Sequence, residues 1–153
     1  MSGNNSASAA TFYGITFPSG AEAKRYLVLR DLLEKGIITD LKVAARGDIT
    51  PFVLVPAFED ADNRHHQDVA YTPDFMYRYA DGHAVLADYD GRVWHIEEIK
   101  GRIYKDYPLR KKLFLWFYGK HYVFHEYNSR GREINPPRAT KRRSARRRRR
   151  AAA

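Results

Sequence analysis

Two short polar patterns within apolar stretches of the chain could carry chemistry. Pro73-Asp74 lies in a stretch with aromatic residues at alternate positions, and Glu98-Ile99-Lys100 ends a second such stretch. Residues two apart in a strand share a face, so Glu98 and Lys100 would project together. If Asp74 lay opposite Glu98 in an antiparallel pair, their Cβ atoms would be about 5 Å apart. Two carboxylates at that distance repel each other, and a cation would relieve the repulsion.

The chemistry expected of this set is metal-assisted hydrolysis of a phosphodiester. Oxygen ligands favour Mg²⁺ or Mn²⁺ over zinc, and the backbone carbonyl of Ile99 would add another oxygen. A metal held by Asp74 and Glu98 would bind the phosphodiester and lower the pKa of a water, while Lys100 would stabilise charge developing on phosphorus. The alternative is that Asp74 only starts a turn and that Glu97, Glu98 and Lys100 form a solvated face. The residues by themselves leave both interpretations open.

The strand register that opposes Asp74 to Glu98 makes a structural prediction. The same register opposes Tyr79 to Val93, so residues 80–92 would form an excursion beyond the hairpin. A strand inserted between the two would separate the carboxylates by two strand spacings, roughly 10 Å. That separation is too large for one metal ion, and we therefore predict the excursion.

A third carboxylate, Glu22, lies at the start of a run with apolar residues at helical spacing. The run predicts a helix over residues 20–35, ended by Gly36. Ser19 and Glu22 fit a capping box, with Ser19 as the N-cap. The alternative is that Glu22 presents a third carboxylate to the metal. From the residues alone, the capping role is favoured.

Further patterns predict the remaining elements. Alternating apolar residues bounded by turn signals predict strands, and Gly119 ends a second helix that carries basic residues. Trp94 and Trp116 are expected in the core rather than as base-stacking surfaces. The order of helix, strands, helix and strand predicts an α/β fold, a mixed sheet with helices packed on it. The expected strands cover residues 50–58, 66–79, 92–100 and 121–127, and the second helix covers residues 107–118.

The order of these motifs resembles a family of small phage and prophage proteins described only as a domain of unknown function. Its members look like PD-(D/E)XK nucleases and are similar to phage and archaeal junction-resolving endonucleases. The resemblance covers residues 14–127. The matching residues are Phe17, Ser19, Glu22, Ala23, Arg25, Tyr26, Gly36, Ile38, Tyr71, Asp74, Phe75, Tyr77, Glu98, Lys100 and Gly101.

The resemblance implies a restriction-endonuclease-like core of αβββαβ type, with a mixed sheet flanked by helices. It implies a catalytic site made of Glu22, Asp74, Glu98 and Lys100. It also favours a metal-binding role for Glu22, which would keep its capping role as well.

The implied activity is that of a Mg²⁺-dependent endodeoxyribonuclease acting on DNA, such as Holliday junctions or other branched DNA of recombination. Lys111 or Lys112 in the second helix would contact phosphate, and a solvated helix face is an equal alternative. A two-fold homodimer would suit a junction, with one site for each cut strand. The alternative function is a non-catalytic nucleic-acid-binding protein on a nuclease-like scaffold.

The excess positive charge lies at the C-terminus. Residues 138–153 contain nine Lys or Arg and no acid, so the other 18 basic residues balance the 18 acidic ones. Such an arm would bind nucleic acid by neutralising phosphates, which provides affinity without sequence specificity. An inert end, or docking on an acidic protein, are the alternatives. The nucleic-acid contacts expected there are Arg142, Arg143, Arg146, Arg147, Arg148, Arg149 and Arg150.

Composition fits one domain in a reducing compartment. The 153 residues suit a single domain, and the absence of cysteine excludes disulfides and cysteine-based zinc sites. Neither a signal-peptide pattern nor a membrane-spanning apolar run is present, so we expect a cytoplasmic protein (in the host cell if phage-encoded) without a membrane partner. The expected divisions are a disordered lead over residues 1–11, a nuclease-like domain over residues 12–128, and a linker with a disordered Arg-rich tail over residues 129–153.

Overall fold

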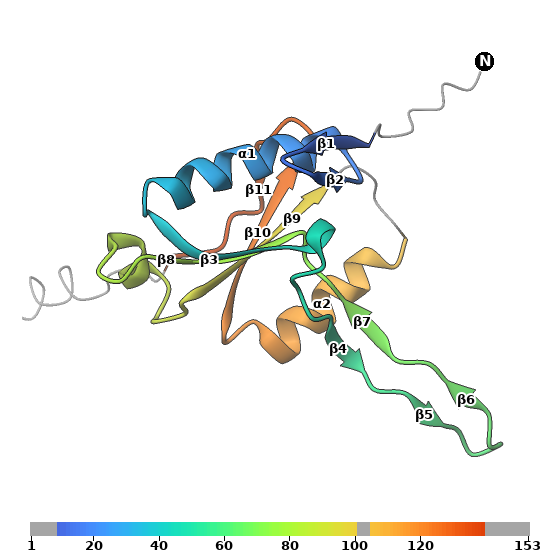
Figure 1. Ribbon diagram of the computed structural model, residues 1–153. Coiled ribbons are helices and arrows are strands. Elements are labelled where there is room, and N and C mark those ends of the chain that lie inside the picture. The colour runs from blue at the N-terminus through green and yellow to red at the C-terminus, as the bar shows by residue number, and fades with distance from the viewer. Residues whose placement is uncertain (1–8, 101–104, 140–153) are drawn as a thin grey trace, which may run out of the picture.

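The computed structural model describes residues 9–100 and 105–139, and its centre is a five-stranded sheet (Figure 1). The strand order is β11-β10-β9-β8-β3. Neighbouring strands are antiparallel except β9 and β10, which are parallel. The predicted mixed sheet is therefore confirmed. Its strands are β3 (Ile38–Val43), β8 (Phe75–Tyr79), β9 (Trp94–Lys100), β10 (Tyr122–Asn128) and β11 (Glu133–Ile134).

Two helices cover opposite faces of the sheet, α1 (Gly20–Glu34) and α2 (Tyr107–Tyr118) (Figure 1). Both predicted helices are confirmed. Helix α2 has the predicted bounds, and α1 begins at the predicted residue and ends one residue earlier than predicted. The Ser19 hydroxyl oxygen accepts the backbone N–H of Glu22 at 3.2 Å. The same hydroxyl donates to the Glu22 carboxylate at 2.9 Å. Ser19 thus caps α1 as predicted, and Gly36, with φ of +67°, follows the end of the helix.

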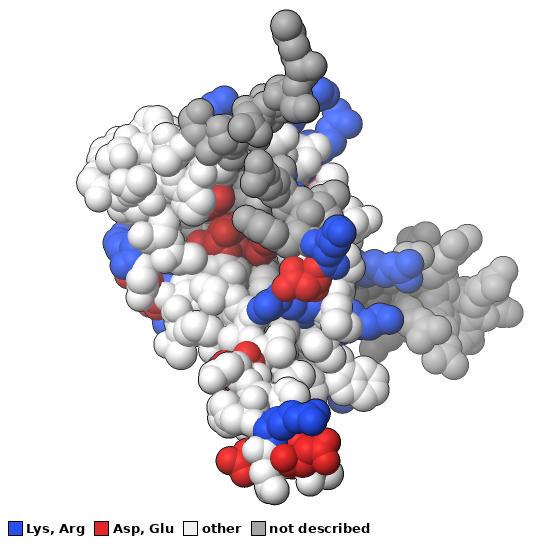
Figure 2. Space-filling view, turned by 90° about the vertical axis from the view of Figure 1, so that its right-hand side faces the viewer, with Lys and Arg blue, Asp and Glu red and all other residues white. Residues whose placement is uncertain are grey.

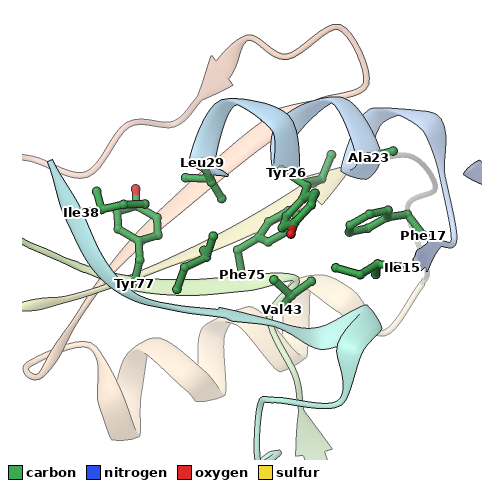
Figure 3. Close-up of a cluster of buried hydrophobic side chains, with 11 residues drawn as sticks. Ile15, Phe17, Ala23, Tyr26, Leu29, Ile38, Val43, Phe75 and Tyr77 are labelled. Atoms are coloured by element: carbon green, nitrogen blue, oxygen red, sulfur yellow. The ribbon is translucent and has the colours of Figure 1, made fainter. Parts of the chain in front are cut away.

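Each face of the sheet has its own hydrophobic core. Because alternate strand residues face opposite sides, Ile99 packs on the α1 side and Ile96 on the α2 side. Figure 3 shows the α1-side core, in which side chains from α1, β2 (Ile15–Phe17), β3 and β8 interlock. Its buried members include Phe17, Tyr26, Leu29, Phe75 and Tyr77, and the α2-side core includes Tyr71, Met76, Ile96, Phe114 and Phe124.

A two-stranded arm projects from the body of the protein (Figure 1). It consists of β4 (Phe52–Val55) paired with β7 (Val69–Tyr71), and farther out β5 (Phe58–Glu59) paired with β6 (His65–His66). The continuous strand predicted over residues 66–79 is therefore wrong. The strand breaks between β7 and β8 at Pro73, because proline cannot donate a backbone hydrogen bond to a neighbouring strand.

The ends of the domain also differ from the predicted divisions. Strand β1 (Ala10–Phe12) pairs with β2 and begins within the predicted lead, and β11 pairs with β10 within the predicted linker. The tail arginines expected to contact nucleic acid, from Arg142 to Arg150, lie outside the described residues. No helix in the described part of the chain is both long and apolar enough to cross a bilayer.

The prediction that both tryptophans lie in the core is wrong for Trp116. Trp94 is partly buried against the α2-side core, but Trp116 is 79% exposed. Helix α2 turns Tyr107, Phe114 and Tyr118 toward the core. At 3.6 residues per turn, a residue two positions from Phe114 points to the opposite side of the helix.

Candidate active site

The register of β8 and β9 brings Asp74 and Glu98 together. Phe75 pairs with Glu97 and Arg78 with Trp94, so Asp74 stands opposite Glu98 one step before β8 begins. The backbone N–H of Asp74 donates to the Glu97 carbonyl at 3.0 Å. Strands β8 and β9 are neighbours, and residues 80–92 form a loop with the short helix η2 (Ala84–Asp88). The predicted register and the predicted excursion are both confirmed.

Hydrogen bonds orient both carboxylates. The Ile99 backbone N–H donates to Asp74 Oδ2 at 2.6 Å. The Tyr71 hydroxyl, at the base of the arm, donates to Glu98 Oε2 at 2.7 Å. Within the described residues, none of the hydrogen bonds uses Asp74 Oδ1 or Glu98 Oε1. Each carboxylate therefore keeps one oxygen for another ligand.

The carboxylates of Asp74, Glu98 and Glu22 act on one another electrostatically. Burial, and then the charges of Glu98 and Glu22, raise the pKa of Asp74 well above its usual range. Burial raises the pKa of Glu98 to about 7, with Glu22 adding to the shift and the Tyr71 hydrogen bond and Lys100 opposing it. Burial also raises the pKa of Glu22, against the Ser19 hydrogen bond. Figure 2 shows acidic side chains gathered near the middle of one face of the protein.

A fourth carboxylate, Glu126, was not predicted as a site residue. It lies on β10 beside Glu98 in the parallel register, and only 2% of it is exposed. The Tyr107 hydroxyl and Lys111 Nζ donate to its two oxygens at 2.6 and 2.7 Å. Burial favours the neutral acid, but the hydrogen bonds from Lys111 and Tyr107 outweigh it and lower the pKa of Glu126. The signal for Glu126 is an acid within an apolar strand, the same signal that marked Glu98.

Lys100 contacts Glu126 and Tyr107 and forms no ion pair with Asp74 among the described residues. Its Nζ lies 3.6 Å from Glu126 Oε1 and 3.3 Å from the centre of the Tyr107 ring. Its charge still favours the ionised form of Glu98. Lys100 therefore lies beside Glu126 and acts on Glu98 through its charge.

The two basic residues expected to contact phosphate differ in their surroundings. The ammonium of Lys111 is bound to Glu126, and its side chain is 24% exposed. Lys112 is exposed on the outer side of α2. Of the two, Lys112 is thus the one that presents its charge to solvent.

Glu97, on the opposite face of β9, is a buried partner of α1. Arg25 donates to both of its oxygens at 2.7 Å, and the Tyr77 hydroxyl donates at 2.8 Å. The alternative of a solvated charged face is wrong for Glu97, which is fully buried. Because Glu22 lies three residues before Arg25, this ion pair also positions Glu22 near the end of β9.

The donor atoms at Asp74 and Glu98 are all oxygen, which suits Mg²⁺ or Mn²⁺. In residues 9–100 and 105–139, no group of three or more His, Asp or Glu side chains is arranged to hold a metal ion. Mg²⁺ is commonly bound through one or two carboxylates, with waters completing its shell. The N–H of Ile99 points toward Asp74, and the N–H and C=O of one antiparallel strand residue point to the same side. The Ile99 carbonyl is thus on the Asp74 side of β9.

A family model described as "Protein of unknown function (DUF1064)" matches residues 4–127. The chain belongs to the DUF1064 family. This matched region includes Glu22, Asp74, Glu98, Lys100 and Glu126, and it ends before the Arg-rich tail. No match was found among curated proteins, and none among solved structures.

Proposed function

We propose that this DUF1064 protein is a metal-dependent endonuclease that hydrolyses phosphodiester bonds in DNA. The observation that carries the proposal is the opposition of Asp74 and Glu98, whose carboxyl pKa values are both raised. Repelling, half-buried carboxylates with free oxygens are unfavourable for stability alone and are typical of functional sites. A divalent cation between them would remove the repulsion.

The element order supports this proposal. The helices and the main-sheet strands follow the order α1, β3, β8, β9, α2, β10 and then β11 along the chain. The first six elements give the αβββαβ order expected of a PD-(D/E)XK core. The proposed catalytic residues come from the start of α1, the segment before β8 and the end of β9, which lie together.

The residues take separate roles in the proposed reaction. Asp74 and Glu98 would hold Mg²⁺ or Mn²⁺, with Glu22 and the Ile99 carbonyl as further oxygen ligands. The bound ion would supply Lewis acidity toward a phosphodiester oxygen. Lys100 would stabilise negative charge on the phosphate. Glu126, which lies beside the Lys100 ammonium, would be a positioning residue.

The proposed substrate is DNA, with branched DNA such as a four-way junction as the preferred form. The Arg-rich tail would add affinity through phosphate contacts. A two-fold homodimer would present one site to each of two strands. We propose that the protein acts in the cytoplasm, without a membrane partner.

The test is cleavage of end-labelled four-way junction, flap and linear duplex DNA in Mg²⁺, in Mn²⁺ and in EDTA. Intact protein would be compared with Asp74→Ala and Lys100→Ala. Glu34→Gln is the matched control, since Glu34 is exposed and pairs with Arg30 on α1. We expect metal-dependent cutting by the intact protein and the control, and none by the other two variants. Cutting that survives Asp74→Ala would overturn the proposal.

The alternative is a nucleic-acid-binding protein that keeps a nuclease-like scaffold without catalysis. It is favoured by the lack of three converging metal-ligating side chains in the described part of the chain. Tight, salt-sensitive DNA binding without cutting in either metal would establish it.

A further inference from the structure

The outward face of α2 carries an exposed aromatic ring between basic side chains. Trp116 is 79% exposed, and Leu109 on the same helix is 59% exposed. Lys112 lies four residues before Trp116, and Lys120 lies four residues after it, just beyond the helix end. Side chains four apart on a helix are neighbours. Trp116 is therefore bordered by an ammonium on the turn before it.

The charges on this face are available to a ligand. Among the ion pairs of the described residues, none involves Lys112 or Lys120, whereas Lys111 on the inner side is paired with Glu126. Asp106, the N-cap of α2, pairs with Arg110. The face formed by Leu109, Lys112, Trp116 and Lys120, here called the tryptophan face, thus combines an exposed ring with uncompensated positive charge.

This combination fits a single-stranded nucleic acid better than another protein. Sites for single strands pair cations, which follow the phosphates, with aromatic rings on which bases stack. Protein interfaces are enriched in tryptophan but depleted in lysine. If two copies met through this face, Lys112 and Lys120 would oppose lysines of the other copy. The charge therefore favours a polyanion as the occupant.

We infer that the tryptophan face binds single-stranded nucleic acid, with a base stacked on Trp116 and flanking phosphates on Lys112 and Lys120. The inference shares its class of ligand with the proposed nuclease function, but it requires neither a metal nor catalysis. Helix α2 begins at Tyr107, which contacts Lys100 and Glu126. The N-terminal end of α2 is thus the end that adjoins the candidate active site.

The first test uses fluorescence of Trp116 in EDTA. The chain has two tryptophans, so Trp94→Phe leaves Trp116 as the only one. Titration with a (dT)20 oligonucleotide should quench its emission to saturation, because the base stacks on the indole. Unchanged emission while labelled (dT)20 binds the protein overturns the inference, since binding would then occur elsewhere.

The second test measures the affinity of full-length variants for fluorescein-labelled (dT)20 by anisotropy. Trp116→Ala should weaken binding about tenfold, and Trp116→Phe should restore most of it, because stacking needs an aromatic ring. Trp116→Leu, which keeps apolar area without a ring, should behave like Trp116→Ala. The double variant Lys112→Gln, Lys120→Gln should reduce the slope of log K against log salt by about 1.4. Lys35→Gln is the control, because Lys35 is exposed on α1 and pairs with Asp31.

Other occupants have distinct outcomes. A dimer in sedimentation velocity that Trp116→Ala dissociates, with no quenching by (dT)20, would make this face a protein interface and overturn the inference. A blue shift of Trp116 emission on phosphatidylserine vesicles, again without quenching by (dT)20, would overturn it in favour of a membrane surface. Quenching by (dT)20 in a protein that cuts no DNA would support the tryptophan face while the proposed nuclease function fails.

Discussion

Arg25 donates two hydrogen bonds, each 2.7 Å long, to the fully buried carboxylate of Glu97. The pair joins α1 to the middle strand of the sheet. It leaves the charge of Glu97 compensated, whereas Asp74 and Glu98, which meet near the end of β9, have no such ion pair within the described part of the chain.

Removing Arg25 should therefore destabilise the fold strongly. Arg25→Met leaves the Glu97 charge buried without its partner, which costs about 3–5 kcal/mol for a pair of this kind. Urea denaturation followed by circular dichroism would measure the change. Arg30→Met, which breaks the exposed Arg30–Glu34 pair, should cost less than about 1 kcal/mol. Equal effects of the two substitutions would contradict the assigned role of the Arg25–Glu97 pair.

Mutations at the start of α1 should distinguish helix capping by Ser19 from the proposed metal binding by Glu22. Ser19→Ala removes the cap of α1 and should cost about 1 kcal/mol of stability, with little effect on cleavage. Glu22→Gln keeps an oxygen for the Ser19 hydroxyl, so stability should change little while cleavage falls. Urea titration and the junction-cleavage assay would measure both. If Glu22→Gln lowers stability and leaves cleavage intact, Glu22 serves only as part of the cap.

Divalent metal binding should depend on the proton affinity of the carboxylates. Because the pKa of Glu98 is raised to about 7, protons compete with the metal below that pH, and binding should release protons. Titration calorimetry with Mn²⁺ in buffers of different ionisation enthalpy would count those protons. Affinity should rise between pH 6 and about pH 8 and be lost in Asp74→Ala. Affinity that is the same in Asp74→Ala would place the metal elsewhere.

His95 should make the fold sensitive to acid. It is fully buried, and one of its ring nitrogens lies 2.8 Å from His125. Burial, and then the charges of His125 and Arg92, lower the pKa of His95 from its usual value of 6.5 to about 3. Below pH 6.5, His95 is protonated in the unfolded chain but stays neutral in the folded protein. The stability that neutral His95 contributes is therefore fully present above pH 6.5 and declines as the pH falls toward 3.

The comparison that tests this sensitivity is between intact protein and His95→Phe. The difference in their free energies of unfolding should shrink or reverse sign as the pH falls from 6.5 toward 3, because phenylalanine does not titrate. His65→Gln is the control, since His65 is exposed on the arm. A difference that is constant over this range would show that His95 does not titrate in the predicted way.

Much of the candidate site could be predicted from local sequence patterns. The helical spacing of apolar residues predicted α1 and α2, because a helix packed on a sheet needs one apolar face. The opposition of Asp74 and Glu98 was also predicted, on the condition that both carboxylates lie close enough to share one metal ion, and the register bears it out. A shift of one residue would move every apolar side chain of these strands to the wrong face, so the alternating pattern leaves few registers.

Other features depended on contacts between segments distant in the chain. Glu126 lies beside Glu98 only because β10 returns parallel to β9 after α2, and no local pattern states which strands become neighbours. Packing between distant segments also decided that the arm separates from the sheet at Pro73 and that Trp116 points to solvent. Periodicity shows which residues share a face, and local sequence is sufficient for that. Which partner covers that face depends on the packing of the whole chain, and here it buried Glu97 and Glu126 while leaving Trp116 exposed.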